Sequence, residues 1–379
     1  MLSMINSPKK IRMLWSSDHH TLHEGTPTVH ILSNLGEFFY KYNSLAETDI
    51  VVFGGDFFHK LVDASNSSMR LCEYWINKFL IRCAENNVVV RVLEGTSSHD
   101  WEQPEIFQIL SPDNLDLKWV KELSIERIEK LDMTVLYVPD NMGGKKPEVI
   151  WDEVIDLLTK HNLEKVDFIF FHGSFKYQLD ERFSKHSHDE KLWSTIVNYY
   201  IFAGHIHKPS ECGPIRCSGS FDRTGHSEEH PKGGYIVDYF PDDKKCTATF
   251  YENKKALPYI TLRITPETTT EELNDKLGFL MDKRYPKASH FWIRGGNPLV
   301  VNPIIQFFKQ QYPQYDFKKE NVVTHEAVID DELYTEDLYS GITLTKDNII
   351  PSLMGYLNKK ILLVDEELDS LTKTMEEFI

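Results

Sequence analysis

Short apolar runs rich in β-branched and aromatic residues alternate with amphipathic stretches through the first two thirds of the 379-residue chain. The runs have the length of β-strands, and the stretches between them repeat with the period of α-helices. This repetition predicts an α/β domain in which much of the sheet is parallel and buried on both faces. Strands are predicted at 11–16, 49–54, 88–93, 134–138, 166–171 and 199–203, with shorter β-like runs at 215–218, 234–239 and 248–251, and helices at about 28–45, 67–86, 148–162 and 189–197.

The chain divides into segments of different character. Residues 1–256 hold the alternating pattern, and residues 257–323 contain fewer strand-like and helix-like runs, which predict a compact α+β module. In this module Thr269 stands three residues before a glutamate, a capping signature that opens a helix. Residues 324–348 are acidic and weakly periodic and are interpreted as a linker. Residues 349–379 carry apolar side chains at helical spacing, which indicates one or two amphipathic helices.

The composition is that of an ordinary globular protein, with 41% hydrophobic and 26% charged residues. No apolar run approaches the ~18 to 20 residues of a membrane span, and the N-terminus lacks the apolar core of a signal peptide. We therefore expect a cytoplasmic protein without a membrane segment. The five cysteines are odd in number and form no Cys-x-x-Cys pair, so we expect reduced thiols rather than a disulfide scaffold or a zinc ribbon.

The formal net charge of −16 makes the chain acidic. Basic surface dominates the affinity of proteins that bind nucleic acid broadly and unaided, so the charge argues against that class. It leaves open a nucleic-acid substrate that is held at a metal centre or by a basic partner.

Aspartate and histidine residues stand directly after five of the predicted strands, next to glycine or other small residues that allow sharp turns. Open α/β sheets place their functional sites at the carboxyl ends of the strands. A single histidine in such a position is usually a core residue, but five coincidences at one topological position favour a functional site. The candidate residues are Asp18, His20, Asp56, His59, Ser98, His99, His172, His205 and His207.

These candidates form a mixed set of oxygen and nitrogen donors. Two carboxylates with several imidazoles suit Mn²⁺, iron or Zn²⁺ better than Mg²⁺ alone. Asp56 stands between two histidine-bearing segments, where one carboxylate can bridge two ions about 3.5–4 Å apart. Such a pair lowers the pKa of a bound water and holds both the attacking and the leaving oxygen of a displacement at phosphorus. The predicted chemistry is metal-assisted phosphoester hydrolysis.

The order of the motifs resembles that of the calcineurin-like metallophosphoesterase superfamily: Asp-x-His, Gly-Asp, a glycine loop ending in His-Asp, His-Gly and Gly-His-x-His, over residues 11–255. Within it, the chain is most similar to the SbcD family, the nuclease subunits of double-strand-break repair and recombination complexes, and to their phage counterparts. This similarity is carried by His59 three residues after Asp56, by the segment 218–223 with the glycines that follow it, and by the module at 257–323. The resemblance implies a sandwich of mixed sheets flanked by helices, a small α+β capping domain for DNA recognition, and a helical C-terminal tail.

The resemblance also implies a role for each candidate residue. His99 would act near the leaving oxygen as a general acid or transition-state stabiliser, and His59 would position the scissile phosphate or the neighbouring strand. The residues alone leave both histidines open as orienting groups behind the metal ligands. For two ions, expected to be Mn²⁺, the implied ligands are Asp18, His20, Asp56 and His207 at one and Asp56, His172 and His205 at the other.

One position departs from the family pattern. The family has an asparagine directly before the loop histidine, whose amide oxygen ligates the second metal, and here that position is Ser98. A serine hydroxyl is a shorter and poorer ligand. Several outcomes stay open: Ser98 or a water fills the position, the second ion binds weakly, or Asp100 turns in.

We therefore expect a metal-dependent DNA exonuclease and endonuclease that hydrolyses phosphodiester bonds at DNA ends or hairpins. By the resemblance, it works as a homodimer within a heterotetramer, and its tail at 349–379 binds an SbcC-like coiled-coil ATPase that supplies basic surface. A terminal amphipathic stripe can also dock on its own domain, but the acidic linker favours a partner groove.

Two alternative functions stay open. One is a metallophosphoesterase for small phosphodiesters or phosphoproteins. The other is a weakly active scaffold subunit, if Ser98 disables the second metal site; one bound ion per chain would favour it.

Overall fold

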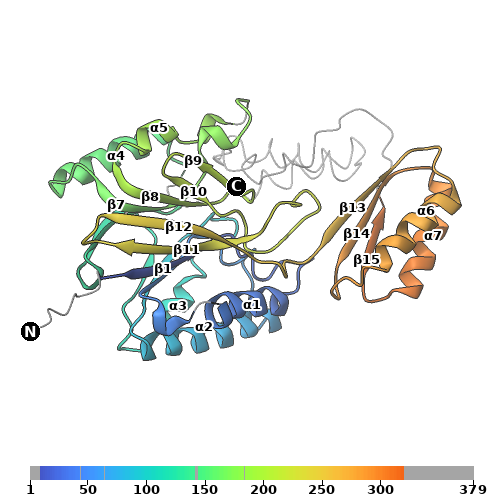
Figure 1. The fold of residues 1–379 in the computed structure, drawn as a ribbon, viewed down its shortest axis with the longest axis horizontal. Helices are drawn as coiled ribbons and strands as arrows, with labels where there is room; N and C mark the ends of the chain where they lie inside the picture. The colour runs from blue at the N-terminus through green and yellow to red at the C-terminus, as the bar shows by residue number, and fades with distance from the viewer. Residues whose placement is uncertain (1–8, 43, 64, 141–143, 183, 320–379) are drawn as a thin grey trace, which may run out of the picture. The chain divides into compact units, whose positions relative to one another are not determined.

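The computed structural model describes residues 9–319, except 43, 64, 141–143 and 183. Two six-stranded sheets pack face to face, and helices cover the outer face of each (Figure 1). The predicted fold class, a sandwich of mixed sheets flanked by helices, is confirmed. The linker predicted at 324–348 and the tail predicted at 349–379 lie outside the described residues.

The first sheet is mixed. Its strands are, in spatial order, β12 (Lys245–Glu252), β11 (Gly233–Phe240), β1 (Ile11–Ser16), β2 (Ile50–Phe53), β3 (Val89–Leu93) and β4 (Leu117–Val120). Strands β1 to β4 run parallel, so their carboxyl ends meet at one edge, and β11 pairs antiparallel with β1 and β12. The helices over its outer face are α1 (Thr28–Gly36), which continues as a π-helical segment at Glu37–Tyr42, α2 (Ser67–Glu85) and α3 (Glu105–Ile109).

The second sheet is also mixed. Its strands are, in spatial order, β5 (Ser124–Ile128), β6 (Met133–Val138), β7 (Val166–His172), β8 (Val197–Gly204), β10 (Ile215–Cys217) and β9 (Ser210–Cys212). Strands β6, β7, β8 and β10 run parallel, and the two edge strands pair antiparallel. Helices α4 (Pro147–Lys160) and α5 (Glu190–Trp193) pack on its outer face.

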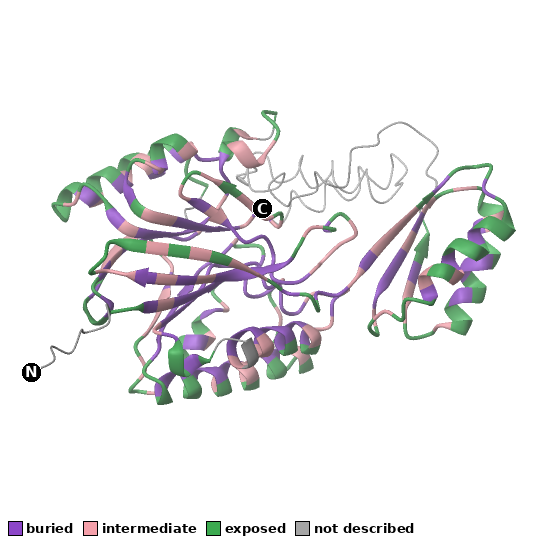
Figure 2. Cartoon of the chain, viewed as in Figure 1, coloured by how far each residue is buried: buried purple, intermediate pink, exposed green. Residues whose placement is uncertain are grey.

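Alternate residues of the central strands enter different cores, because successive side chains of a strand point to opposite faces. In β1, Trp15 lies between the two sheets, whereas Leu14 packs against the helices. The Trp15 ring centroid lies 5.7 Å from that of Phe170 and 5.6 Å from that of Phe202, and both phenylalanines belong to the second sheet. Buried residues concentrate in the strands and on the inner faces of the helices (Figure 2). This packing holds the strand-end loops of the two sheets against each other.

A smaller sheet follows in the chain. Three parallel strands, β13 (Tyr259–Ile264), β14 (His290–Gly295) and β15 (Asp316–Lys319), alternate with α6 (Thr270–Met281) and α7 (Pro298–Gln311). Thr269 caps α6 as predicted: Glu272 N donates to Thr269 Oγ1 at 3.2 Å, and Thr269 N donates to Glu272 Oε2 at 3.0 Å. The module has its own hydrophobic cluster, which includes Phe291 and Phe308.

The structure differs from the sequence-based expectations in several short elements. Strands β4, β5 and β9 were not predicted, because they are three to five residues long and lie partly exposed at or near sheet edges. Helix α7 begins at Pro298 and runs through Pro303. Short 3₁₀ helices lie at Leu45–Glu47, Glu129–Leu131, Lys176–Gln178 and Ser184–His186. Within the described part of the chain, no helix has the length and apolar character that crossing a membrane requires.

Candidate metal centre

Two groups of carboxylates and imidazoles meet where the strand-end loops of the two sheets face each other. In each group, the candidate ligand atoms lie within 4.8 Å of one another. We call Asp18, His20 and His207 the first ligand cluster, and Asp56, His172 and His205 the second ligand cluster. The structure therefore brings together six of the seven residues predicted as metal ligands.

Several of these residues have left-handed backbone conformations. The φ angle is 51° at Asp18, 47° at His20, 51° at Asp56 and 88° at His205. Residues other than glycine rarely adopt positive φ, and such strain concentrates at functional sites because the surrounding structure must enforce it. The tight turns aim the side chains back over the ends of the strands, which explains why the ligands converge.

The loop that carries Asp56 is held by Asp100. The Asp100 Oδ2 atom accepts hydrogen bonds from Asp56 N and Gly95 N, both at 2.9 Å, and Oδ1 accepts one from Phe58 N at 3.0 Å. Burial and the nearby Asp56 carboxylate raise the pKa of Asp100 well above its usual value. Both oxygens bind backbone N–H groups, so Asp100 holds the loop, and it belongs to neither ligand cluster.

His172 connects the second ligand cluster to the first sheet. Its Nδ1 donates to Gly54 O at 2.6 Å, and its Nε2 lies 3.2 Å from Asp56 Oδ2. A Cβ atom at Gly55, where φ is 93°, would lie 2.2 Å from His172 Nδ1, so only glycine allows this approach. Burial opposes the charged form, but the Asp56 and Asp18 carboxylates raise the pKa of His172 well above its usual value. Carboxylates therefore outweigh positive groups around the His172 imidazole, and a site that binds a cation needs such an excess of negative charge.

The first ligand cluster has the donors of a metal site. The Nε2 atoms of His20 and His207 lie 2.8 Å apart. Burial lowers the pKa of His20 well below its usual value, and His207 lowers it further, so His20 is in the neutral form that binds metal. Asp18 Oδ1 accepts a hydrogen bond from His205 N at 2.8 Å, whereas Asp18 Oδ2 is buried and has no hydrogen-bond partner among the described residues. An unsatisfied buried carboxylate oxygen beside the neutral imidazole of His20 fits a bound cation.

Glu228 orients His207, although no feature of the sequence marked it. His207 Nδ1 donates to Glu228 Oε1 at 2.5 Å. The buried Lys232 Nζ lies 3.1 Å from Glu228 Oε2, and Thr224 N donates to that oxygen at 2.8 Å. Burial opposes ionisation, but Lys232 and His207 hold the pKa of Glu228 well below its usual value. The carboxylate therefore fixes the tautomer of His207 with Nε2 directed to the ligand cluster, as carboxylates do behind metal-binding histidines.

We expect Glu228→Gln to weaken binding of one Mn²⁺ ion by about 10- to 100-fold, the usual cost of losing an orienting carboxylate behind a metal ligand. Calorimetric titration of the metal-free protein measures the effect. Glu229→Gln is the matched control, because Glu229 is adjacent and exposed. Equal affinities in the two variants would show that Glu228 only supports the loop.

His59 and His99 lie beside the first ligand cluster. Together with His20 they form a third group of imidazoles. His99 is buried, and its Nδ1 donates to His59 O at 2.5 Å, which orients the ring with Nε2 on the opposite side. His59 Nδ1 lies 3.4 Å from His20 Nδ1. Neither residue joins a carboxylate-containing cluster, in agreement with roles next to the metal ligands.

Thr96, in the 95–100 loop, contacts side chains of the second ligand cluster. Its N donates to Asp56 Oδ1 at 2.6 Å, and its Oγ1 lies 3.3 Å from both Asp56 Oδ2 and His205 Nδ1. Ser98, predicted as a ligand, is exposed. Its role at a metal ion stays a prediction.

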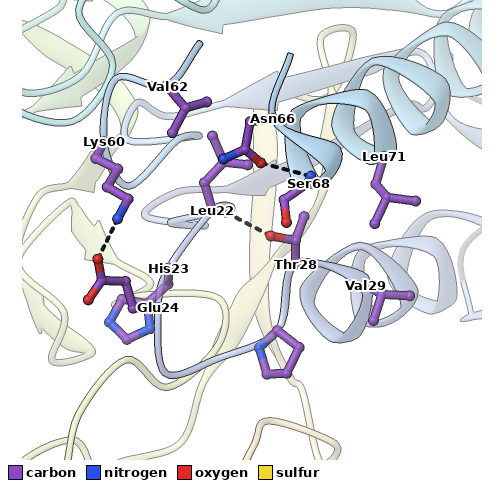
Figure 3. A pocket seen from close by; sticks show the side chains of 11 residues that line it. Leu22, His23, Glu24, Thr28, Val29, Lys60, Val62, Asn66, Ser68 and Leu71 are labelled. Carbon is purple, nitrogen blue, oxygen red and sulfur yellow. Dashed lines mark hydrogen bonds and ion pairs between the residues drawn. The ribbon is translucent and has the colours of Figure 1, made fainter. Parts of the chain in front are cut away.

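A pocket of about 410 Å³ is lined in part by the loop that follows His20 (Figure 3). Residues from the beginnings of α1 and α2 line it, and so do Lys60 and Glu24, which form an ion pair at 2.5 Å. His23 also lines the pocket, and its ring centroid lies 4.5 Å from that of His59. None of the predicted site residues is part of the lining. The pocket therefore adjoins the metal centre without containing it.

No family model and no curated protein matches the chain. Among solved structures, the crystal structure of TT1561 of Thermus thermophilus is similar with a TM-score of 0.36 and 10% sequence identity, over 64% of this chain and 99% of that one. Another crystal structure is similar with a TM-score of 0.35 and 12% identity, over 64% of this chain and 100% of the other. Likenesses at these scores add nothing to the geometry of the site.

Proposed function

We propose that the protein is a metal-dependent phosphodiesterase that acts as a DNA exonuclease and endonuclease at DNA ends or hairpins. The observation that supports this most is the pair of adjoining ligand clusters. Asp18 of the first ligand cluster accepts a hydrogen bond from the backbone N–H of His205 of the second ligand cluster, so the two clusters are directly adjacent. Two adjacent sites with carboxylate and imidazole donors are the arrangement used for in-line displacement at phosphorus.

A bound pair of divalent ions supplies an activated water and neutralises charge on the phosphate. The protein contributes rigid ligands: Asp56 is fixed by Thr96, and His207 is fixed by Glu228. It also contributes His99, whose Nδ1 remains bonded to His59 O. In its imidazolium form, His99 donates the Nε2 proton to the leaving oxygen of the cleaved strand.

DNA is favoured over a small phosphodiester because the 259–319 module contacts the loop that follows His20. His290 Nε2 lies 2.8 Å from Gly25 O, and Tyr259 Oη lies 2.8 Å from Thr26 Oγ1. A polymer bound at the metal centre can therefore also reach the module. A small phosphodiester would make no use of it.

The decisive experiment is Mn²⁺-dependent cleavage of end-labelled linear DNA by the purified chain, with bound metal counted in parallel. We expect cleavage and two ions per chain. Hydrolysis of small phosphodiesters without DNA cleavage would instead support the small-substrate alternative. No hydrolysis with a single bound ion would support a scaffold subunit.

The proposal includes a coiled-coil ATPase of the SbcC type as partner and a homodimer within a heterotetramer. We expect deletion of residues 349–379 to abolish association with that ATPase, measured by co-purification, and to leave hydrolysis of a small phosphodiester unchanged. The intact chain is the control. Loss of both properties would show that the deleted segment belongs to the folded domain.

A further inference from the structure

Arg223 binds three main-chain carbonyl groups that belong to two separate segments of the chain. Its Nε donates to Glu228 O at 3.0 Å and its Nη2 to His230 O at 3.4 Å, both in the loop whose carboxylate orients His207. Its Nη1 donates to Ala256 O at 2.9 Å, in the segment between β12 and β13. The half-buried guanidinium therefore ties the loop behind a metal ligand to the segment that leads into the 259–319 module.

The chemistry of this contact requires arginine. A planar guanidinium offers five N–H donors in fixed directions, whereas the ammonium group of lysine is a compact point charge. The main chain of Arg223 is also held in place: its O accepts a hydrogen bond from Thr26 Oγ1 at 2.6 Å, and its N donates to Asp222 Oδ1 at 2.9 Å. The position of the guanidinium is thus fixed from its own backbone outward.

The neighbouring residue Asp222 binds the same connecting segment. Its buried Oδ1 also accepts a hydrogen bond from Leu257 N at 2.7 Å, and its Oδ2 accepts one from Asn34 Nδ2 at 2.6 Å. Two consecutive residues, Asp222 and Arg223, therefore hold two consecutive residues, Ala256 and Leu257. The point where the chain enters the module is anchored to the segment that also supports Glu228.

The two ends of Glu228 have different partners. Its side chain accepts the hydrogen bond from His207 Nδ1, and its main-chain oxygen accepts the one from Arg223 Nε. We infer that Arg223 is a positioning residue for the first ligand cluster: it holds Glu228, through which it keeps His207 directed at the ion, and it links this ligand to the module. This inference rests on the metal centre of the proposed function.

The test is a Mn²⁺ titration of the full, metal-free chain in four forms: the unchanged protein, Arg223→Gln, Glu228→Gln and the double variant. We expect Arg223→Gln to weaken one site by about tenfold, within the usual cost of losing an orienting group behind a metal ligand, and to leave the other site unchanged. In the Glu228→Gln background the same substitution has no further effect, because residues that act through one another are not additive. Arg182→Gln is the matched control, since Arg182 is exposed.

Three results of this titration overturn the inference: unchanged affinity in Arg223→Gln, equal losses at both sites, or losses that add in the double variant. The variant Arg223→Lys covers the case in which glutamine prevents folding. Lysine keeps the charge and the alkyl chain, but one ammonium group does not reproduce the fork of donors, so we expect the same single site to weaken. Full affinity in Arg223→Lys also contradicts the inference.

A second readout needs no metal. In the metal-free chain with ¹⁵N-labelled histidine, the Nδ1–H proton of His207 is bonded to Glu228 and gives a signal that Glu228→Gln removes. We expect Arg223→Gln to speed the exchange of this proton with water by about tenfold, the same factor as the loss of affinity. An unchanged exchange rate overturns the inference. Faster exchange in a chain that binds fewer than two ions or cleaves no DNA supports the inference and removes the proposed function alone.

Discussion

Replacing Asp56 with asparagine is expected to reduce Mn²⁺-dependent DNA cleavage on the order of 10³-fold, the scale of losing a group that stabilises transition-state charge directly. In the proposed mechanism Asp56 would bridge the two ions, and in the structure its Oδ2 lies 3.2 Å from His172 Nε2. An amide oxygen binds a cation more weakly than a carboxylate and cannot bridge two ions with a full negative charge. The measurement is the initial rate of cleavage of end-labelled DNA, with bound metal counted in the same samples.

Asparagine tests this role better than alanine because it preserves the loop. The φ of 51° at Asp56 is one that asparagine tolerates better than other residues with a side chain. The amide oxygen can still accept the hydrogen bond that Thr96 N donates to Asp56 Oδ1 at 2.6 Å. Asp132→Asn is the matched control, since Asp132 has a φ of 50° and is exposed. Cleavage at the unchanged rate in Asp56→Asn would show that the second ligand cluster is not catalytic.

The position of residues at the ends of strands predicted most of the site. Parallel strands share an edge, so residues directly after them were expected to meet, and His172 and His205, which end or follow the parallel strands β7 and β8, do.

Other features of the site could not be predicted from the order of strands and loops. The packing of Trp15 against the second sheet holds the two sheets face to face. This arrangement brings His207 close to Asp18. Asp100 looked like a possible ligand because sequence does not show that three backbone N–H groups point at its oxygens. Glu228 lies in a polar loop without periodicity, and only the folded chain places it against His207.

Replacing His99 with glutamine is expected to lower DNA cleavage by about 10²- to 10⁴-fold, the range for loss of a general acid, while two metal ions remain bound. His99 is buried, and its Nδ1 is bonded to His59 O at 2.5 Å, so the ring can deliver a proton only from Nε2. Glutamine can keep a hydrogen bond to the same carbonyl but cannot supply a proton. His161→Gln is the control, because His161 is exposed at the end of α4.

Comparing substrates with different leaving groups distinguishes two roles for His99. It can act as a proton donor, or it can only position the DNA. A nitrophenyl ester of a nucleotide releases a weakly basic phenolate that needs no proton, so a lost general acid costs little with this substrate. We therefore expect His99→Gln to hydrolyse the nitrophenyl ester at nearly the unchanged rate and DNA far more slowly. Equal losses on both substrates, with both ions bound, would assign His99 to positioning the phosphate. Unimpaired DNA cleavage in His99→Gln would remove His99 from the mechanism altogether.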